Sequence, residues 1–310
     1  MNKRKHQAIG IFCLLIILML WGGSCTLKGV SLSQPPSIVQ PPVQSSPKPA
    51  KIALVLGAGS SKGFAHIGVL KVLETNKVPI HMIIGTSVGS AVGCLYAYGY
   101  DAFQLQKVSF SIEKGDVVDL IIPDNGFIKG EKLEEFINKT VNHTPIEKLK
   151  IPFYAVATDV QSGQEIVFGR GNTGQAVRAS CSIPGVFRPM KIGDRVYVDG
   201  GVVSPVAVDA AKKLGADVVI AVDISKDTDR SKPEGTMETI FQSLNIMYSK
   251  LAAIQVSQAD VVIRPRVGHI GSSDFSKRHE AILEGEKAAV EALPQIRGIL
   301  AQLQQEGRLD

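Results

Sequence analysis

A ten-residue stretch, residues 80–89, constrains the fold more than any other part of the chain. A short apolar run ends in Gly-x-Ser-x-Gly, with Ser87 flanked by Gly85 and Gly89, and the small or apolar residues through Gly99 predict a helix. A strand, a sharp turn and a helix with a serine at the apex form a nucleophile elbow, which holds the hydroxyl in the open at the end of a sheet. Taken alone, the motif fits a plain strand-to-helix turn equally well, because glycine and serine are common in loops.

A glycine-rich loop follows the first expected strand, residues 52–56, and precedes a helix expected from Phe64 to Asn76. A loop that opens a helix exposes backbone N–H groups at the positive end of the helix dipole, so it is suited to bind an anion. Its residues are Gly57, Ala58, Gly59, Ser60, Ser61, Lys62 and Gly63. Lys62 either holds an anionic head group, orients the loop, or is simply solvated.

Three anions compete for this loop. A dinucleotide pyrophosphate fits poorly, because the third glycine of Gly-x-Gly-x-x-Gly falls one residue late and no acidic residue follows in the expected place. A nucleotide phosphate is disfavoured because Gly-Lys-Ser/Thr is absent. The oxyanion of a tetrahedral intermediate is favoured, since Ser87 lies 24 residues after Gly63 and a parallel sheet brings both loops to the same carboxyl edge.

Alternating strands and helices predict one α/β domain with three layers, α/β/α, around a mainly parallel central sheet. Further strands are expected at 152–159, 165–168, 195–198, 217–223 and 261–265, and helices at 131–141, 175–180 and 237–258. Ser204 is expected to cap a helix with Pro205 in its first turn and Gly215 at its end, and Pro294 to divide two terminal helices. Residues 99–130 are mixed in character and are expected to form a lid or a substrate wall.

Asp199 ends an expected strand and is followed by Gly200 and Gly201, which makes it a candidate for the group that activates Ser87. A serine hydroxyl needs a base, and an aspartate with an ordinary pKa of about 4 is a weak one. Therefore either Asp199 lies in a tuned site beside Ser87 or a histidine acts instead.

Other titratable residues offer weaker alternatives. His66 follows the glycine loop, where a packed histidine is expected rather than a catalytic one. His269 and His279 follow the acid in the order of a Ser…Asp…His hydrolase. Asp159 and Asp223 also end expected strands, and each fits a cap or a loop residue.

Three motifs together resemble the patatin-like phospholipase family, most closely its bacterial members, over residues 51–289. They are the glycine loop followed by His66-Ile67-Gly68-Val69-Leu70, the elbow at Ser87, and an Asp-Gly box at Asp199-Gly200-Gly201, preceded by the segment 178–185. The resemblance implies a serine–aspartate dyad in which Ser87 attacks an ester and Asp199 takes its proton, an oxyanion hole in the loop, no cofactor and no required histidine. Two departures are Ala58 in place of a frequent glycine and Lys62 in place of a frequent arginine.

The N-terminus is typical of a bacterial lipoprotein signal. Basic residues 3–5, an apolar run from Ala8 to Trp21 and small residues before Cys25 predict a signal peptide over 1–24 and lipidation of Cys25. Gly22 departs from the usual aliphatic residue, and ordinary cleavage or an uncleaved anchor are the alternatives. Residues 25–50 are rich in proline and serine and predict a disordered linker before a hydrolase domain at 51–310. The expected location is the cell envelope, anchored to a membrane.

Charge and cysteine content limit the classes of binding partner that this chain is expected to have. The formal charge is +5, but three positive charges lie in residues 3–5, so the rest of the chain is near +2 and shows no nucleic-acid footprint. Cys94 and Cys181 are expected to be buried thiols, and no Cys/His cluster has the spacing of a metal site. The expected partners are a phospholipid or another lipid acyl ester and a membrane. The competing hypotheses are an inactive relative that binds lipid or acts as a scaffold, and a dinucleotide- or phosphate-binding protein.

Overall fold

The computed structural model describes residues 47–120, 126–225, 235–271 and 273–309. The expected signal peptide over 1–24, the lipidation site Cys25 and the linker as far as residue 46 lie outside the described residues. Within the described ranges, no helix combines the length and the apolar character that a membrane span needs.

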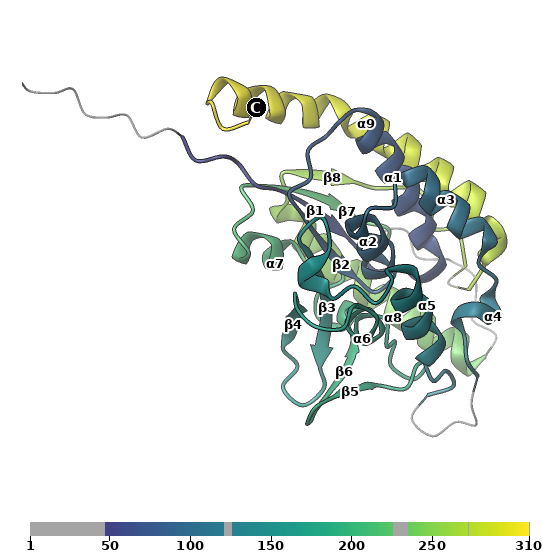
Figure 1. The fold of residues 1–310 in the computed structure, drawn as a ribbon. Helices are drawn as coiled ribbons and strands as arrows, with labels where there is room; N and C mark the ends of the chain where they lie inside the picture. Colours follow the sequence, from purple (N-terminus) through teal and green to yellow (C-terminus); the bar gives the residue numbers. More distant parts are fainter. Residues whose placement is uncertain (1–46, 121–125, 226–234, 272, 310) are drawn as a thin grey trace, which may run out of the picture. The chain divides into compact units, whose positions relative to one another are not determined.

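The strands of the described residues form one eight-stranded sheet (Figure 1). The strands are β1 (Ile52–Leu56), β2 (Met82–Thr86), β3 (Phe153–Asp159), β4 (Glu165–Phe168), β5 (Met190–Ile192), β6 (Arg195–Asp199), β7 (Val218–Val222) and β8 (Val261–Ile263). Their order is β5-β6-β3-β2-β1-β7-β8, and β4 pairs with β3. The central five strands, from β3 to β8, pair in parallel, whereas β4, β5 and β6 join by antiparallel pairs. The mainly parallel sheet is confirmed, with an antiparallel edge.

Helices cover both faces of the sheet. They are α1 (Phe64–Thr75), α2 (Val88–Tyr98), α3 (Ala102–Ser111), α4 (Lys114–Val117), α5 (Glu131–Thr140), α6 (Thr173–Ser180), α7 (Val208–Lys213), α8 (Thr236–Gln255) and α9 (Arg278–Gln305). Short 3-10 turns are η1 (Ser60–Gly63), η2 (Ile146–Lys148), η3 (Gly200–Val202), η4 (Val256–Gln258) and η5 (Phe275–Lys277).

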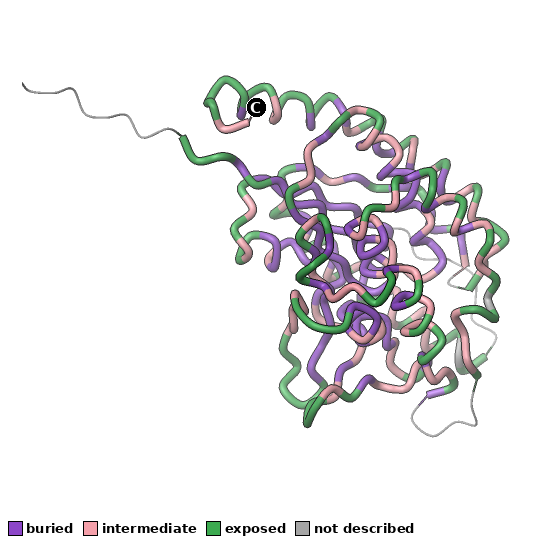
Figure 2. The backbone as a smooth tube through the Cα atoms, viewed as in Figure 1, coloured by how far each residue is buried: buried purple, intermediate pink, exposed green. Residues whose placement is uncertain are grey.

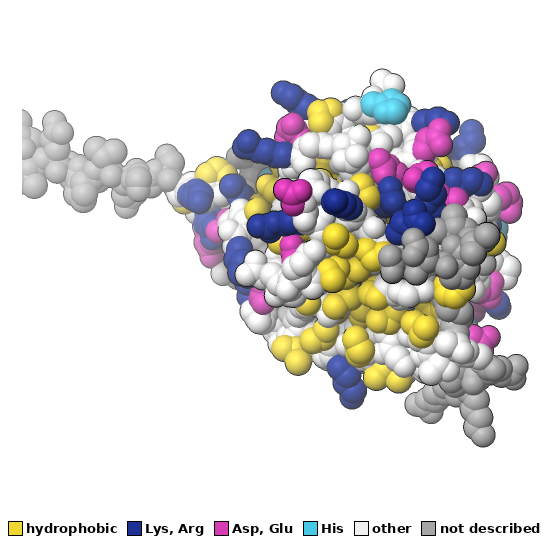
Figure 3. All heavy atoms as spheres, turned by 90° about the horizontal axis from the view of Figure 1, so that it is seen from below, with side chains coloured by type: hydrophobic (Ala, Val, Ile, Leu, Met, Phe, Trp, Pro, Cys, Tyr) yellow, Lys and Arg dark blue, Asp and Glu magenta, His cyan; other side chains and the backbone are white. Residues whose placement is uncertain are grey.

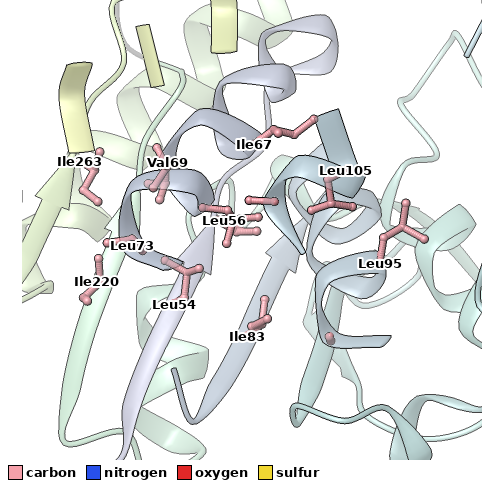
Figure 4. Packing of buried hydrophobic residues seen from close by; sticks show 14 of the residues in the cluster. Leu54, Leu56, Ile67, Val69, Leu73, Ile83, Leu95, Leu105, Ile220 and Ile263 are labelled. Atoms are coloured by element: carbon pink, nitrogen blue, oxygen red, sulfur yellow. The ribbon is translucent and has the colours of Figure 1, made fainter. Parts of the chain in front are cut away.

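The side chains of β1 alternate between two cores, one on each face of the sheet. Leu54 and Leu56 pack into the cluster that contains residues of α1, α2 and α9, as Figure 4 shows for Leu73 of α1. Ala53 and Val55 pack into the cluster that contains residues of α7 and α8. Because both faces are covered, strands β1, β2 and β7 are buried along their whole length (Figure 2). The three-layer α/β/α architecture is therefore confirmed.

The prediction that Pro294 divides two helices is wrong, because α9 continues through it from Arg278 to Gln305. A proline inside a helix removes a hydrogen bond and costs about 3 kcal/mol. Residues on both sides of Pro294 are nevertheless buried, among them Ala289 and Ile296. Burial of this long helix face against the body of the domain outweighs the local cost.

The helix predicted to begin at Ser204 begins later, at Val208. The carbonyl groups before it are used elsewhere: Ser204 O accepts from Thr86 Oγ1 at 2.9 Å, and Pro205 O accepts from the Ala58 N–H at 2.9 Å. This segment therefore supports the elbow and the glycine loop instead of starting a helix.

Candidate functional site

Ser87 lies between β2 and α2 with a strained backbone. Its φ of 55° and ψ of −127° are rare for a residue with a side chain. The two flanking glycines leave no room for anything larger: a Cβ on Gly85 would lie 2.4 Å from Ser90 Cα, and one on Gly89 would lie 2.1 Å from Leu56 O. The strand, sharp turn and helix predicted around Ser87 are present, and close backbone packing holds them.

Ser87 and Asp199 meet in the interior. Ser87 Oγ donates to Asp199 Oδ2 at 2.6 Å, and the Gly201 N–H donates to Asp199 Oδ1 at 2.7 Å. Ser87 is 4% exposed and Asp199 is 0% exposed. Ser180, at the end of α6, accepts a hydrogen bond from the Ser87 N–H through its Oγ at 2.9 Å. The structure thus brings together the two side chains that the sequence singled out.

The acidity of Asp199 is far from ordinary. Burial raises its pKa from 3.8 to about 7, while the hydrogen bonds from Ser87 and Gly201 and the nearby Tyr248 hydroxyl lower it. A carboxyl group with this pKa can accept and release a proton near neutral pH. The tuned site that the sequence argument required is therefore present at Asp199.

The two glycines after Asp199 allow neighbouring parts of the fold to approach the backbone closely. A Cβ on Gly200 would lie 2.2 Å from Val156 O, and one on Gly201 would lie 2.5 Å from Tyr248 Cε2. Both positions therefore exclude a larger residue, and they let the end of β6 pack tightly against β3 and α8.

The glycine loop presents unpaired amides beside Ser87. The N–H groups of Gly57 and Ala58 donate to Val222 O and Pro205 O, and the Lys62 N–H donates to Gly59 O. By contrast, the amides of Gly59 and Ser60 make no hydrogen bond among the described residues. Ser60 has a φ of 51°, so the chain turns sharply at this point.

His66 packs under this loop, as predicted. It is fully buried, and its Nε2 donates to Gly57 O at 2.8 Å, since a carbonyl oxygen can only accept. Burial lowers the pKa of His66 to about 4, so the ring is neutral at ordinary pH. His66 therefore holds the start of the loop.

Lys62 and Ser61 are also buried, at 3% and 5% exposure. The alternative of a solvated Lys62 is therefore wrong. Ser61 Oγ donates to Gly271 O at 2.6 Å, which ties the glycine loop to the segment before α9.

The other candidate histidines and acids have partners elsewhere. His269 Nε2 lies 2.6 Å from Glu280 Oε1, and the His279 ring stacks on Phe110 with centroids 4.2 Å apart. The two acids each hold a turn. Asp159 Oδ1 accepts from the Ser162 N–H at 2.9 Å, and Asp223 Oδ1 accepts from the Ser225 N–H at 3.0 Å.

Ser87 opens into a pocket of about 790 Å³ whose walls are largely apolar. Representative lining residues are Phe64, Val88, Phe136, Ile183, Phe241 and Phe275. The segment 99–130 supplies much of the wall, with Leu105, Val108, Ile112, Val117, Leu120 and Phe127. Leu120 is 78% exposed at this wall. Hydrophobic side chains also gather on one face of the molecule, with lysine and arginine side chains around them (Figure 3).

The two cysteines among the described residues are buried thiols, as predicted: Cys94 and Cys181 are both free and buried. Among the residues that the structure describes, no group of three or more His, Cys, Asp or Glu side chains could hold a metal ion.

Two contributors were not identified from the sequence. In the sequence, Ser180 lies within the segment 178–185 without a role of its own, and Tyr248 lies within the helix expected over residues 237–258. A tyrosine in such a helix has no local signal that marks contact with a loop 47 residues earlier in the chain.

A strained serine on a strand-to-helix turn places the molecule among α/β proteins built on a nucleophile elbow. The family model described as "Patatin-like phospholipase" matches residues 54–212, about half of the chain. The chain therefore belongs to the patatin-like phospholipase family, and the resemblance drawn from its motifs is confirmed.

Curated relatives match large parts of the chain. An uncharacterized NTE family protein of Mycobacterium tuberculosis is 35% identical over 59% of this chain and 51% of its own length. Lysophospholipase NTE1 of Pyricularia oryzae is 30% identical over 79% of this chain and 18% of its own length. The chain thus spans about half or less of these relatives. Among solved structures, VipD from Legionella pneumophila has a TM-score of 0.46 at 12% identity, covering 81% of this chain and 67% of that one.

The close packing at the nucleophile elbow predicts a large loss of stability when one methyl group is added at Gly89. Gly89→Ala places a Cβ 2.1 Å from Leu56 O, a backbone atom that cannot move alone, so we expect a loss of several kcal/mol of stability. Gly298→Ala is the matched control: it lies at an exposed position of α9 with nothing within 4 Å of the added Cβ, and we expect it to stabilise the protein by about 0.5–1 kcal/mol. Urea denaturation of both variants checks this, and equal midpoints would contradict the packing described here.

Proposed function

We propose that this protein is a serine acyl-ester hydrolase that acts on lipid acyl esters through the pair Ser87 and Asp199. The observation that carries the proposal is the 2.6 Å hydrogen bond from Ser87 Oγ to Asp199 Oδ2 beside an apolar pocket. The hydroxyl thus has a base in contact and an opening for a substrate, which are the two requirements of a serine nucleophile.

The reaction proceeds through an acyl-enzyme. Asp199 accepts the Ser87 proton while Oγ attacks the ester carbonyl carbon, and the protonated Asp199 then gives that proton to the leaving alcohol. In the second half, Asp199 takes a proton from water while the water oxygen attacks the acyl carbon. The bond from that carbon to Ser87 Oγ then breaks, Asp199 returns the proton to Oγ, and the fatty acid is released. Its pKa of about 7 suits both directions, because a base with a pKa near the working pH can also return the proton.

The glycine loop supplies the oxyanion hole. The amides of Gly59 and Ser60 are unpaired among the described residues and lie in the loop that packs against α2. Val88, the residue after the nucleophile, begins α2, and its N–H is an unpaired group of a helix start. Such donors stabilise the charge on the carbonyl oxygen in the transition state, and one donor contributes about 10²–10³ in rate.

The lipid nature of the substrate follows from the pocket. A cavity of about 790 Å³ with largely apolar walls favours an acyl chain over a polar group. The name lysophospholipase is attached to relatives that match most of this chain. We therefore propose a phospholipid or lysophospholipid as the substrate class, with the head group outside the pocket.

The alternative is an inactive lipid-binding or scaffold protein. A scaffold has no physical need for a strained serine, a buried carboxyl with a raised pKa, and unpaired loop amides at one place. These features carry energetic costs, so their presence together favours the hydrolase.

Removal of either member of the pair tests the proposal. We expect Ser87→Ala and Asp199→Asn to lower hydrolysis of a p-nitrophenyl ester by at least about 10³-fold, because each removes the nucleophile or its base. Ser257→Ala and Asp194→Asn are matched controls on exposed residues and keep full activity. An inert parent protein on short and long esters, with and without lipid vesicles, would favour the scaffold instead. Retained activity in Asp199→Asn would place the base elsewhere.

The pKa of Asp199 predicts a specific pH profile. The base must be ionised to act, so kcat/KM rises about tenfold per pH unit below the pKa and levels off above about 7. Initial rates from pH 5 to 9 on a soluble ester measure this. A midpoint near pH 4 would show that Asp199 is not the base or is not desolvated in solution.

We further propose that the chain is exported and anchored to a membrane through a lipid on Cys25, on the strength of residues 3–25. The prediction is incorporation of labelled palmitate into the full-length protein and none into Cys25→Ser, with Cys13→Ser as the matched control. Equal labelling of Cys25→Ser and the parent would overturn the lipidation site.

A further inference from the structure

Tyr248 of α8 stands against the loop that holds Asp199. Its side chain is 6% exposed, and its ring packs on Gly201, where an added Cβ would lie 2.5 Å from Tyr248 Cε2 and 3.0 Å from Asp199 Oδ1. The missing side chain at Gly201 therefore makes the space in which the tyrosine and the aspartate meet. This residue lies outside the region 54–212 that the family model matches.

The Tyr248 hydroxyl is buried, and it makes no hydrogen bond of normal geometry among the described residues. Buried hydroxyls are nearly always paired, so an unpaired one needs an explanation. The Asp199 carboxyl is its polar neighbour: the approach of the Tyr248 hydroxyl lowers the pKa of Asp199, and the charge of Asp199 and its contact with the hydroxyl raise the pKa of Tyr248.

Toward an ionised Asp199, the hydroxyl can act only as a donor. Burial, with the charge of Asp199, raises the pKa of Tyr248 well above 10, so the phenol stays protonated through the working range. A carboxylate has about four sites for hydrogen-bond donors. In this structure Asp199 receives two of normal geometry, from Ser87 Oγ and the Gly201 N–H, and the Tyr248 hydroxyl lies near enough to lower its pKa without completing a third.

The proposed reaction removes one of those two donors. Once Ser87 carries an acyl group, its Oγ has no proton to give to Asp199, yet Asp199 must be an ionised, well-oriented base for water. The carboxylate would then keep only the Gly201 N–H in a dry interior. A charge left with so few donors is strongly disfavoured.

We infer that Tyr248 is a positioning residue for Asp199: its hydroxyl donates to the carboxylate in the acyl-enzyme and takes the place of the lost Ser87 donor. This inference rests on the proposed hydrolase function. Tyr248 touches the base and not the substrate, so its role is to hold Asp199 ionised and oriented during deacylation.

Few other titratable groups surround Asp199. Cys181, at the end of α6, faces it, but burial, with the charge of Asp199, raises the pKa of that thiol far above neutral. Ser87 and Gly201 contribute hydrogen bonds without charge. Within the described part of the chain, no charged side chain contributes to the pKa of Asp199. Removing the Tyr248 hydroxyl should therefore move one titration and leave no other group to compensate.

The test is Tyr248→Phe in the full-length protein, with a p-nitrophenyl ester as probe. Loss of a donor to the carboxylate raises the pKa of Asp199, so we expect the midpoint of the kcat profile to move up by about one pH unit, with the rate recovering at high pH. We also expect slower deacylation, seen as a burst of p-nitrophenol followed by a slow steady state.

Tyr197→Phe is the matched control. Tyr197 lies on β6, the strand that carries Asp199, and is 6% exposed with its ring packed on Phe168. Tyr197→Phe also removes one buried tyrosine hydroxyl, and we expect the midpoint of its kcat profile to stay at the wild-type pH. Thermal unfolding verifies that both variants fold. If Tyr248→Phe does not fold, Tyr248→Met fills the space with a flexible side chain and carries the same expectation.

The outcomes separate the two proposals. An active parent whose pH midpoint and burst are unchanged in the folded Tyr248 variant overturns the role of Tyr248 and leaves the hydrolase intact. A uniform loss of rate at every pH also overturns it, because that is the signature of altered packing alone. An inert parent protein overturns the hydrolase proposal and this inference with it.

Discussion

The length of β3 is the constraint on which the site depends. Thr86, at the end of β2, pairs with Val156, but β3 continues to Asp159 beyond the edge of its parallel neighbour. The antiparallel strand β6 pairs with this overhang and runs back, so that Asp199 stands beside Ala157. Because the strand directions oppose, the last residue of β6 arrives next to Ser87, one position past the end of β2. If β3 were shorter, β6 would have no strand to pair with at this point, and Asp199 would not be placed beside Ser87.

Burial then sets the acidity of the Asp199 carboxyl beside Ser87. An exposed aspartate next to a serine would keep a pKa of about 4 and take a proton poorly. The same carboxyl in the interior has a pKa of about 7, because desolvation exceeds the stabilisation from its hydrogen-bond donors. His66 shows the converse, since burial keeps it neutral and confines it to holding the loop at Gly57. The site is thus tuned by dehydration rather than by a neighbouring charge.

The sequence predicted what short-range chemistry controls and missed what tertiary packing controls. The elbow at Ser87, the glycine loop and the strand before Asp199 each have a local signature, and the three-layer fold follows from their alternation. The prediction that Pro294 divides two helices was wrong because the free-energy cost of a proline inside the helix is outweighed by burial of α9. The helix expected over residues 237–258 is present as α8, but its apolar residues Met247 and Ile254 are exposed, whereas Tyr248 is buried. A helix pattern shows periodicity, and only the packing partner shows which face is used.

The apolar pocket and the buried pair depend on each other. Water at Ser87 would solvate Asp199 and return its pKa toward the ordinary range, so the raised pKa needs a dry neighbourhood. Ile183 and Val186, which follow Cys181, line the pocket together with Val88 after the nucleophile. An acyl chain that fills this space excludes water, whereas a polar substrate would bring its own hydration. In the proposed hydrolase, the dehydration that tunes Asp199 as the base therefore also selects an apolar acyl group, so that the same pocket walls set both specificity and reactivity.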